Sequence, residues 1–390
     1  MARPLYEVAD VIRMAGSKFW NDVGKSLSWP QVKVLNAIVR CRTAALGGHR
    51  DRCTCCGYEA VTFHSCRNRH CPKCQVNARE KWLRNRQQEL LPVGYFHIVF
   101  SIPHSLVPLI WQNKKLLLSL FFQTTAATLM EEASDHKRRS MEIGFLCILH
   151  TWGQTLQRHP HIHCVVPGGG LSPDHARWIS SHPRYFLPVK VLSATFRDKF
   201  VEGLEQAHVA GKLSFYGKCE PLADAEAFAA FLKPISEQDW VVYSKPPFGG
   251  PEHVLQYLAR YTHRVAISNH RILSVDESHV TFQWKDYTHD NAQRTKTLTC
   301  EKFLRRFLWH VLPKGLPRIR YFGWLANRRR GELLPLCRAL LNHPTPTAVP
   351  NEPEAPKCPR CQGDMCIVER LTAAQIRFAV HRREDAIDSS

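Results

Sequence analysis

The sequence predicts an α+β fold, in which helices alternate with antiparallel strands and a cysteine-rich segment lies near the N-terminus. Apolar residues recur at helical spacing in the first 47 residues, beginning with Val8, Val11 and Ile12. Later apolar runs are short, which is typical of strands, and only residues 157–160 separate two of them, as suits a hairpin. The predicted strands are 95–102, 143–156, 162–166 and 240–243, and the runs 271–275, 280–287 and 294–299 form a predicted meander.

Five consecutive ranges differ in composition and are predicted to be separate regions. The Cys- and His-rich segment contains few apolar residues, so a metal ion would have to take the place of its hydrophobic core. Between the strands, helices are expected at about 106–133, 194–210, 224–232 and 251–262. The regions are 1–48 (helical), 49–90 (zinc-binding module), 91–270 (strands and helices), 271–340 (meander and helix) and 341–390 (Pro-rich linker and tail).

The charge and cysteine content indicate the partner and the compartment. Lys and Arg number 53 against 34 Asp and Glu, a formal net charge of +19. A chain this basic most often binds a polyanion, with nucleic acid the leading candidate, although a basic protein with no specific ligand has the same composition. No apolar run reaches the roughly 20 residues of a membrane span, and the N-terminus lacks the apolar core of a signal peptide, so we expect a cytoplasmic protein. Because the cytoplasm is reducing, the 15 cysteines are expected to bind metal rather than form disulfides.

Two Cys-x2-Cys pairs, separated by 14 residues, match the spacing of a zinc ribbon. Each two-residue gap allows a tight turn to place two thiolates on one tetrahedral ion. Two such turns fill all four positions, so the predicted zinc is structural. The expected ligands are Cys53, Cys56, Cys71 and Cys74, with Cys55, His64, Cys66 and His70 as alternatives. A third pair, Cys358-x2-Cys361, has no second pair beside it and represents half a site.

His161-Ile162-His163 lies in a predicted strand. Alternate residues of a strand face the same side, so both imidazoles point one way while Ile162 points into the core. Two histidines placed in this way can hold one divalent ion, although a pair on a solvent-facing surface is a common alternative. With residues 157–160 as the hairpin turn, Gln154 lies opposite His163, where its amide oxygen would suit Mg²⁺ or Mn²⁺ as a third ligand. The alternative third ligands are His159 and His150.

Tyr257 and Tyr261 are four residues apart in a predicted helix and therefore share one face. A tyrosine can attack a phosphodiester and form a covalent phosphotyrosine, although its phenol, with a usual pKa of about 10, needs a metal ion or cations near the phosphate. An aromatic pair packed into the core is the alternative. The cations beside the pair, which we expect to contact DNA, are Arg260, His263 and Arg264.

Together and in this order, the three groups resemble the rolling-circle, HUH-class insertion-sequence transposases of the IS91 family. The resemblance extends from about Arg50 to Asn327. It is carried by the segments Ser65–Gln75 in the zinc module, His159–Cys164 around the histidines and Tyr257–Tyr261 on the helix.

The resemblance implies an antiparallel-sheet HUH nuclease core, with a helical and zinc-ribbon module before it and a C-terminal extension after it. It implies that His161 and His163 bind the catalytic divalent metal. It also implies that Tyr257 and Tyr261 attack single-stranded DNA at element ends and target, retaining the 5′ phosphate and freeing a 3′ hydroxyl. Two tyrosines permit one to hold the first end while the other attacks the second.

Two other functions agree with the same residues. A plasmid or phage replication initiator, or a relaxase, would use the same chemistry, but the zinc module favours the transposase. A non-catalytic, zinc-dependent DNA-binding regulator would have the histidines and tyrosines only as packing residues.

Overall fold

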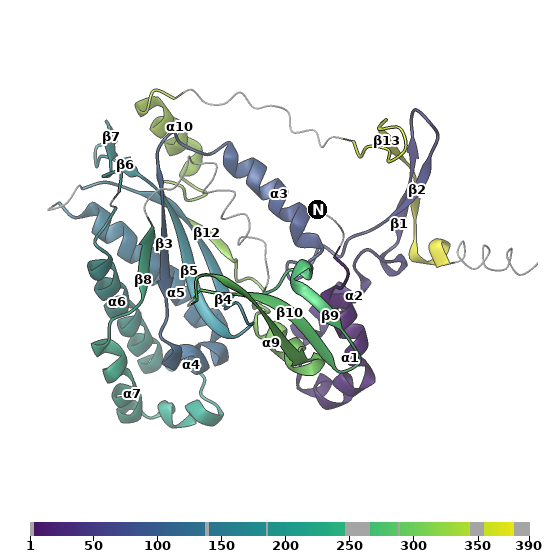
Figure 1. Ribbon diagram of the computed structural model, residues 1–390. Coiled ribbons are helices and arrows are strands. Elements are labelled where there is room, and N and C mark those ends of the chain that lie inside the picture. The colour runs from purple at the N-terminus through teal and green to yellow at the C-terminus, as the bar shows by residue number, and fades with distance from the viewer. Residues whose placement is uncertain are drawn as a thin grey trace, which may run out of the picture. The chain divides into compact units, whose positions relative to one another are not determined.

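The computed structural model describes residues 4–136, 140–184, 186–245, 266–287, 289–343 and 355–377 (Figure 1). The chain forms two compact units, one of residues 1–78, 263–305 and 347–390 and the other of residues 79–262 and 306–346. Each unit combines segments that are far apart in the sequence, so the five consecutive domain ranges stay a prediction. No helix in the described ranges is long and apolar enough to cross a membrane.

The first unit begins with two packed helices, α1 (Val8–Asp22) and α2 (Trp29–Arg40). Both begin with a capping box, in which the residue before the helix and the third residue inside it bond each other's backbone N–H groups. In α2 the Ser28 N–H donates to Gln31 Oε1 at 2.9 Å. The helical spacing predicted here is confirmed, since Val8, Val11 and Ile12 are buried.

Two antiparallel sheets complete this unit. The first has the order β13 (Met365–Leu371), β1 (Gly48–Cys53), β2 (Glu59–Phe63). The strand β13 comes from the range 341–390, for whose last part the sequence predicted no strand. The second is the predicted meander of β9 (Ile272–Val275), β10 (His279–Asp286) and β11 (Ala292–Thr299). The helices α3 (Cys74–Gln87) and α9 (Cys300–Trp309) follow β2 and β11 in the chain.

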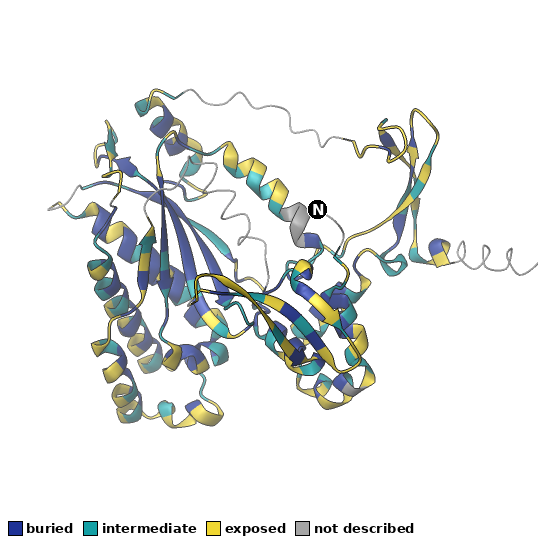
Figure 2. Cartoon of the chain, in the orientation of Figure 1, coloured by how far each residue is buried: buried dark blue, intermediate teal, exposed yellow. Residues whose placement is uncertain are grey.

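The second unit is built on a five-stranded sheet with every neighbouring pair antiparallel. Its strands are, in spatial order, β12 (Ile319–Gly323), β4 (Gly144–Trp152), β5 (Arg158–Pro167), β3 (Tyr95–Ser101) and β8 (Val242–Lys245). The central strands are buried along almost their whole length (Figure 2). Helices and antiparallel sheets together confirm the α+β prediction.

Helices cover one face of this sheet and form the main core. Side chains of α5 (Lys114–Ser134), α6 (Val189–Val209) and α7 (Ala225–Glu237) pack there with alternate strand residues such as Ile162 and Cys164. The helix predicted over 106–133 is divided, because Asn113 ends α4 (Val107–Gln112) and its side-chain amide exchanges hydrogen bonds with the backbone of Ser214. The other face carries a smaller apolar cluster around Leu146, Ile148 and Val165. The unit also contains β6 (Gly169–Leu171), β7 (Trp178–Ser180) and α10 (Arg330–Leu340).

Candidate metal centres and active site

Three histidines converge on the sheet face that is turned away from the helix-covered core. His161 and His163 alternate with Ile162, which is fully buried in that core, so the predicted direction of these side chains is confirmed. The neighbouring strand β4 places His150 directly opposite His161. The ring nitrogens of His150, His161 and His163 lie close enough together to hold one metal ion.

The ring nitrogens pointing away from this meeting point already have partners. His161 Nδ1 lies 2.9 Å from the carbonyl oxygen of His159, and His163 Nδ1 lies 2.8 Å from His97 Nε2. His163 Nε2 is 3.0 Å from His150 Nδ1. If two nitrogens each lie about 2.1 Å from one ion and the angle between the two bonds is about 90°, the nitrogens are about 3.0 Å apart. The distance between His163 Nε2 and His150 Nδ1 therefore also suits two ligands of one metal. The contacts of His161 Nδ1 and His163 Nδ1 would fix which nitrogen of each of these two rings faces a bound ion.

Burial favours the neutral form of His161, His163 and His97. Desolvation, with a smaller contribution from His159, lowers the pKa of His161 to about 3. It lowers the pKa of His163 well below the usual value and that of His97 to about 4. A metal ligand must offer an unprotonated nitrogen, so the burial prepares the site for a cation.

The structure corrects the position predicted for Gln154. The turn between β4 and β5 comprises residues 153–157, so Gln154 lies in the turn, and Ile148 is the residue opposite His163. The strand β5 already begins at Arg158, and Pro160 lies inside it, where the register with β4 shifts. Proline is tolerated at such a bulge because no ladder hydrogen bond is required there. His150, an alternative third ligand from the sequence, lies opposite His161 and close to both His161 and His163.

The predicted nucleophiles and DNA-contacting cations lie outside the described residues. These are Tyr257, Tyr261, Arg260, His263 and Arg264, all within 246–265. The segment follows directly after β8, whose last residue, Lys245, pairs with His97 across β3. The chain therefore enters this segment from the strand beside the histidine that contacts His163.

The cysteines form two separate clusters rather than one. In the first, Cys41 follows the end of α2 and Cys74 begins α3, while Cys66 and Cys71 come from the loop before that helix. Cys74 Sγ lies 3.4 Å from Cys41 Sγ and 3.5 Å from Cys66 Sγ. Hydrogen bonds among the thiols lower the pKa of Cys41 to about 7 and raise the pKa values of Cys66 and Cys71.

The second cluster joins Cys53 and Cys56 to Cys358 and Cys361. The prediction that Cys53, Cys56, Cys71 and Cys74 share one ion is therefore wrong in its pairing, although each of them belongs to a four-cysteine cluster. Of the proposed substitutes, Cys66 is in a cluster, whereas Cys55, His64 and His70 are in neither. Sequence reasoning missed Cys41, which has no neighbouring cysteine in the sequence to mark it.

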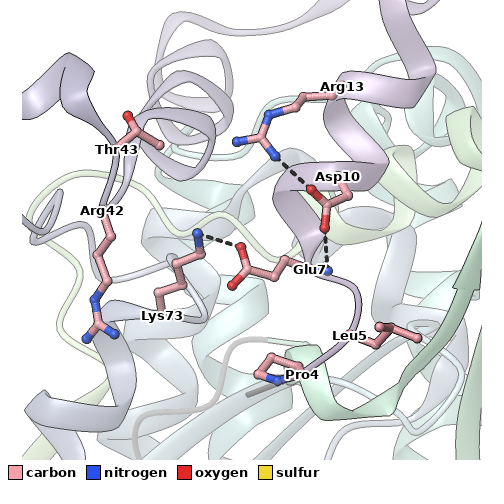
Figure 3. Close-up of a pocket in the computed structure, with 8 residues that line it drawn as sticks. All are labelled: Pro4, Leu5, Glu7, Asp10, Arg13, Arg42, Thr43 and Lys73. Atoms are coloured by element: carbon pink, nitrogen blue, oxygen red, sulfur yellow. Dashed lines mark hydrogen bonds and ion pairs between the residues drawn. The ribbon is translucent and has the colours of Figure 1, made fainter. Parts of the chain in front are cut away.

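A cavity of about 530 Å³ lies against the N-terminal helix α1 (Figure 3). Lys73, which donates to the carbonyl of Cys41, also forms an ion pair with Glu7 at 2.5 Å, and Arg13 pairs with Asp10 at 2.7 Å. Because the two acids in its lining neutralise two of its cations, the cavity offers little net charge to a phosphate, and we assign it no part in the reaction.

Comparisons with known proteins place the chain in a family. Residues 144–332 match the family model described as "Putative transposase", and residues 11–102 match the one described as "Transposase zinc-binding domain". The "Putative transposase y4qJ" of Sinorhizobium fredii is 48% identical over 386 residues, covering 95% of this chain and 96% of that protein. The "Transposase for insertion sequence element IS801" of Pseudomonas savastanoi pv. phaseolicola is 28% identical over 328 residues, covering 82% of this chain and 76% of that protein. No solved structure matches.

This chain belongs to the IS91 family of transposases. The family implies a DNA-processing enzyme that acts in transposition. The zinc-binding match includes all four residues of the first cluster, whose donor set suits a structural Zn²⁺. The transposase match includes the three converging histidines and both tyrosines. Cys358 and Cys361 lie outside both matches.

Proposed function

We propose that this transposase cleaves and rejoins single-stranded DNA at the ends of its element and at the target by rolling-circle transposition through a covalent 5′-phosphotyrosine. The convergence of His150, His161 and His163 on one face of the sheet carries this proposal. The five-stranded sheet and its helices would be the HUH nuclease core expected within 91–270. The first cysteine cluster would be the structural zinc of its N-terminal module.

The donor set fits a divalent cation. Three imidazoles leave room for water and a phosphate oxygen, as a catalytic rather than a structural metal site requires. Replacing the predicted amide oxygen of Gln154 with the nitrogen of His150 makes the site less suited to Mg²⁺, which prefers oxygen ligands. Bound there, the ion would neutralise the charge of the scissile phosphate and stabilise the transition state.

The covalent step is assigned to Tyr257 or Tyr261. The tyrosine gives up its phenolic proton as its oxygen bonds to the scissile phosphorus, the bond from phosphorus to O3′ breaks, and the 3′ oxygen leaves as a hydroxyl by taking up a proton from water, to which the phenolic proton is released. In rejoining, a 3′ hydroxyl bonds to the same phosphorus, and the tyrosine is released and reprotonated. Arg260, His263 and Arg264 would hold the phosphates of the strand.

The tyrosines can be tested with a labelled single-stranded oligonucleotide that carries the element's own terminus, in the presence of Mn²⁺. We expect an SDS-stable protein–DNA adduct that disappears in the Tyr257→Phe, Tyr261→Phe double variant, since phenylalanine has no nucleophilic oxygen. The matched control is Tyr216→Phe, at an exposed tyrosine outside the site, which should keep the adduct. DNA binding without any adduct across varied end sequences would instead support a non-catalytic regulator.

His97 is expected to position His163 rather than to bind the metal. Its Nε2 lies 2.8 Å from His163 Nδ1, and the two rings are nearly parallel, with their centroids 5.0 Å apart. Loss of such a partner typically costs about 10- to 100-fold in metal affinity. We therefore expect His97→Gln to shift the Mn²⁺ dependence of adduct formation to higher concentration by that factor, with near-normal rates at saturation. An unchanged Mn²⁺ titration would exclude this role.

A further inference from the structure

The second cysteine cluster is made from the two ends of the chain. Cys53 is the last residue of β1. It lies against Cys361, which is 308 residues later in the sequence, and Cys56 lies against Cys358, which is 302 residues later. The strand β13 pairs antiparallel with β1 from Gly48 opposite Leu371 to Cys53 opposite Met365. All four cysteines thus lie at one end of the same sheet.

Two Cys-x2-Cys turns in this cluster have the same backbone design. In the first, the Cys53 N–H donates to the carbonyl of Tyr58 at 2.8 Å, and the Gly57 N–H donates to that of Cys53 at 3.2 Å. In the second, the Cys358 N–H donates to the carbonyl of Gly363 at 2.8 Å, and the Gln362 N–H donates to that of Cys358 at 2.9 Å. The residue after the second cysteine is left-handed in both, with φ of 71° at Gly57 and 62° at Gln362.

Backbone N–H groups also point at the sulfur atoms. Cys53 Sγ accepts from the N–H groups of Cys55 at 3.4 Å and Cys56 at 3.5 Å, and Cys358 Sγ accepts from that of Arg360 at 3.4 Å. Such hydrogen bonds stabilise negative charge on a thiolate, whichever cation it binds. Gly363 lies against the cluster, since a Cβ there would come within 3.3 Å of both Cys53 Sγ and Cys361 Sγ.

The spacing of the sulfurs agrees with a tetrahedral ion and excludes disulfides. Cys53 Sγ and Cys361 Sγ are 3.4 Å apart, and Cys56 Sγ and Cys358 Sγ are 3.7 Å apart. Four sulfurs at about 2.3 Å from one Zn²⁺ would be about 3.8 Å from one another, whereas bonded sulfurs lie about 2.05 Å apart. With four thiolates there is no open position for a substrate, so the role is structural.

We propose that Cys53, Cys56, Cys358 and Cys361 bind a second structural Zn²⁺, which fastens the C-terminal segment 355–377 to the sheet of the N-terminal module. Each end of the chain supplies half of the ligands. This zinc clasp is distinct from the first cluster, with which it shares no residue. It is also independent of the proposed strand-cleavage chemistry, because none of its ligands belongs to the histidine site.

The zinc content of the purified full-length chain, measured by mass spectrometry of the metal, tests the clasp. We expect about two zinc ions per chain in the unaltered protein and about one in the Cys358→Ser, Cys361→Ser double variant. Cys55→Ser and Cys366→Ser are matched controls, since these cysteines lie in the same turn and the same strand but outside both clusters, and each should keep both ions. One ion in the unaltered protein, or two in the double variant, would overturn the proposal.

A spectroscopic measurement keeps the test independent of how well the variant folds. Titration of the metal-free, reduced, unaltered chain with Co²⁺ should fill two sites with the intense absorption of tetrahedral cobalt thiolates. Saturation at one equivalent overturns the clasp without any substitution. In the double variant we expect this absorption to fall by about half, and hydrogen exchange of the β13 amides to become faster, because the remaining ion occupies only the first cluster.

Discussion

Replacing His161 with alanine is expected to reduce strand cleavage by about 1,000-fold or more, because it removes one of the three proposed ligands of the proposed catalytic metal. A loss of this size corresponds to about 4 kcal/mol of transition-state stabilisation, which is within what a metal ion at a phosphate supplies. Binding of the end DNA should change little, since phosphate contacts elsewhere in the chain provide it. The measurement is the rate of adduct formation under single-turnover conditions with saturating Mn²⁺.

The matched control is His159→Ala in the same strand. His159 is exposed, and the contact that His161 Nδ1 makes with it is to the backbone oxygen, which alanine retains. The same comparison applies to His150→Ala, which we expect to resemble His161→Ala, and to Gln154→Ala, which we expect to resemble the control. If Gln154→Ala were the more damaging of the two, the assignment of His150 as third ligand would be wrong.

The second large effect is expected at the first cysteine cluster. Cys74→Ser should release one zinc ion and unfold the N-terminal module, because Cys74 is a proposed ligand of the ion and also begins α3. Structural zinc contributes about 10 kcal/mol or more to the folding of small zinc domains at pH 7. We expect the thermal transition of the module to be lost, and proteolysis within residues 41–74 to become rapid at temperatures where the unaltered protein resists it.

Cys55→Ser, at an exposed cysteine outside both clusters, serves as the control and should melt like the unaltered protein. A Cys74→Ser protein with full zinc content and an unchanged transition would show that Cys41, Cys66 and Cys71 do not depend on Cys74 to hold an ion. Addition of a chelator to the unaltered protein should reproduce the loss, since it removes the same ion.

The sequence predicted those features that depend on local spacing. Alternation in a strand correctly placed Ile162 in the core and His161 and His163 on the opposite face. Helical spacing correctly placed the buried residues of α1. In both cases the period of the apolar residues alone decides the direction of a side chain, so no knowledge of distant residues is needed.

Features that depend on distant partners were not predictable in the same way. Four thiolates around one ion satisfy its geometry however far apart they lie in the chain, so spacing identified the Cys-x2-Cys turns but not their pairing. The end of α4 at Asn113 depends on hydrogen bonds to Ser214, 101 residues later. The turn predicted at residues 157–160 is displaced because β5 begins at Arg158 and accommodates Pro160 at a register shift with the neighbouring strand.

The pairing of β1 with β13 has a consequence for how the protein is made. The ribosome completes residues 48–53 long before it reaches their partner strand at 365–371. At roughly 5–20 residues per second, the nascent chain waits for tens of seconds with one edge of β1 unpaired. A polypeptide that is terminated before residue 365 never acquires that strand, so it cannot assemble this three-stranded sheet.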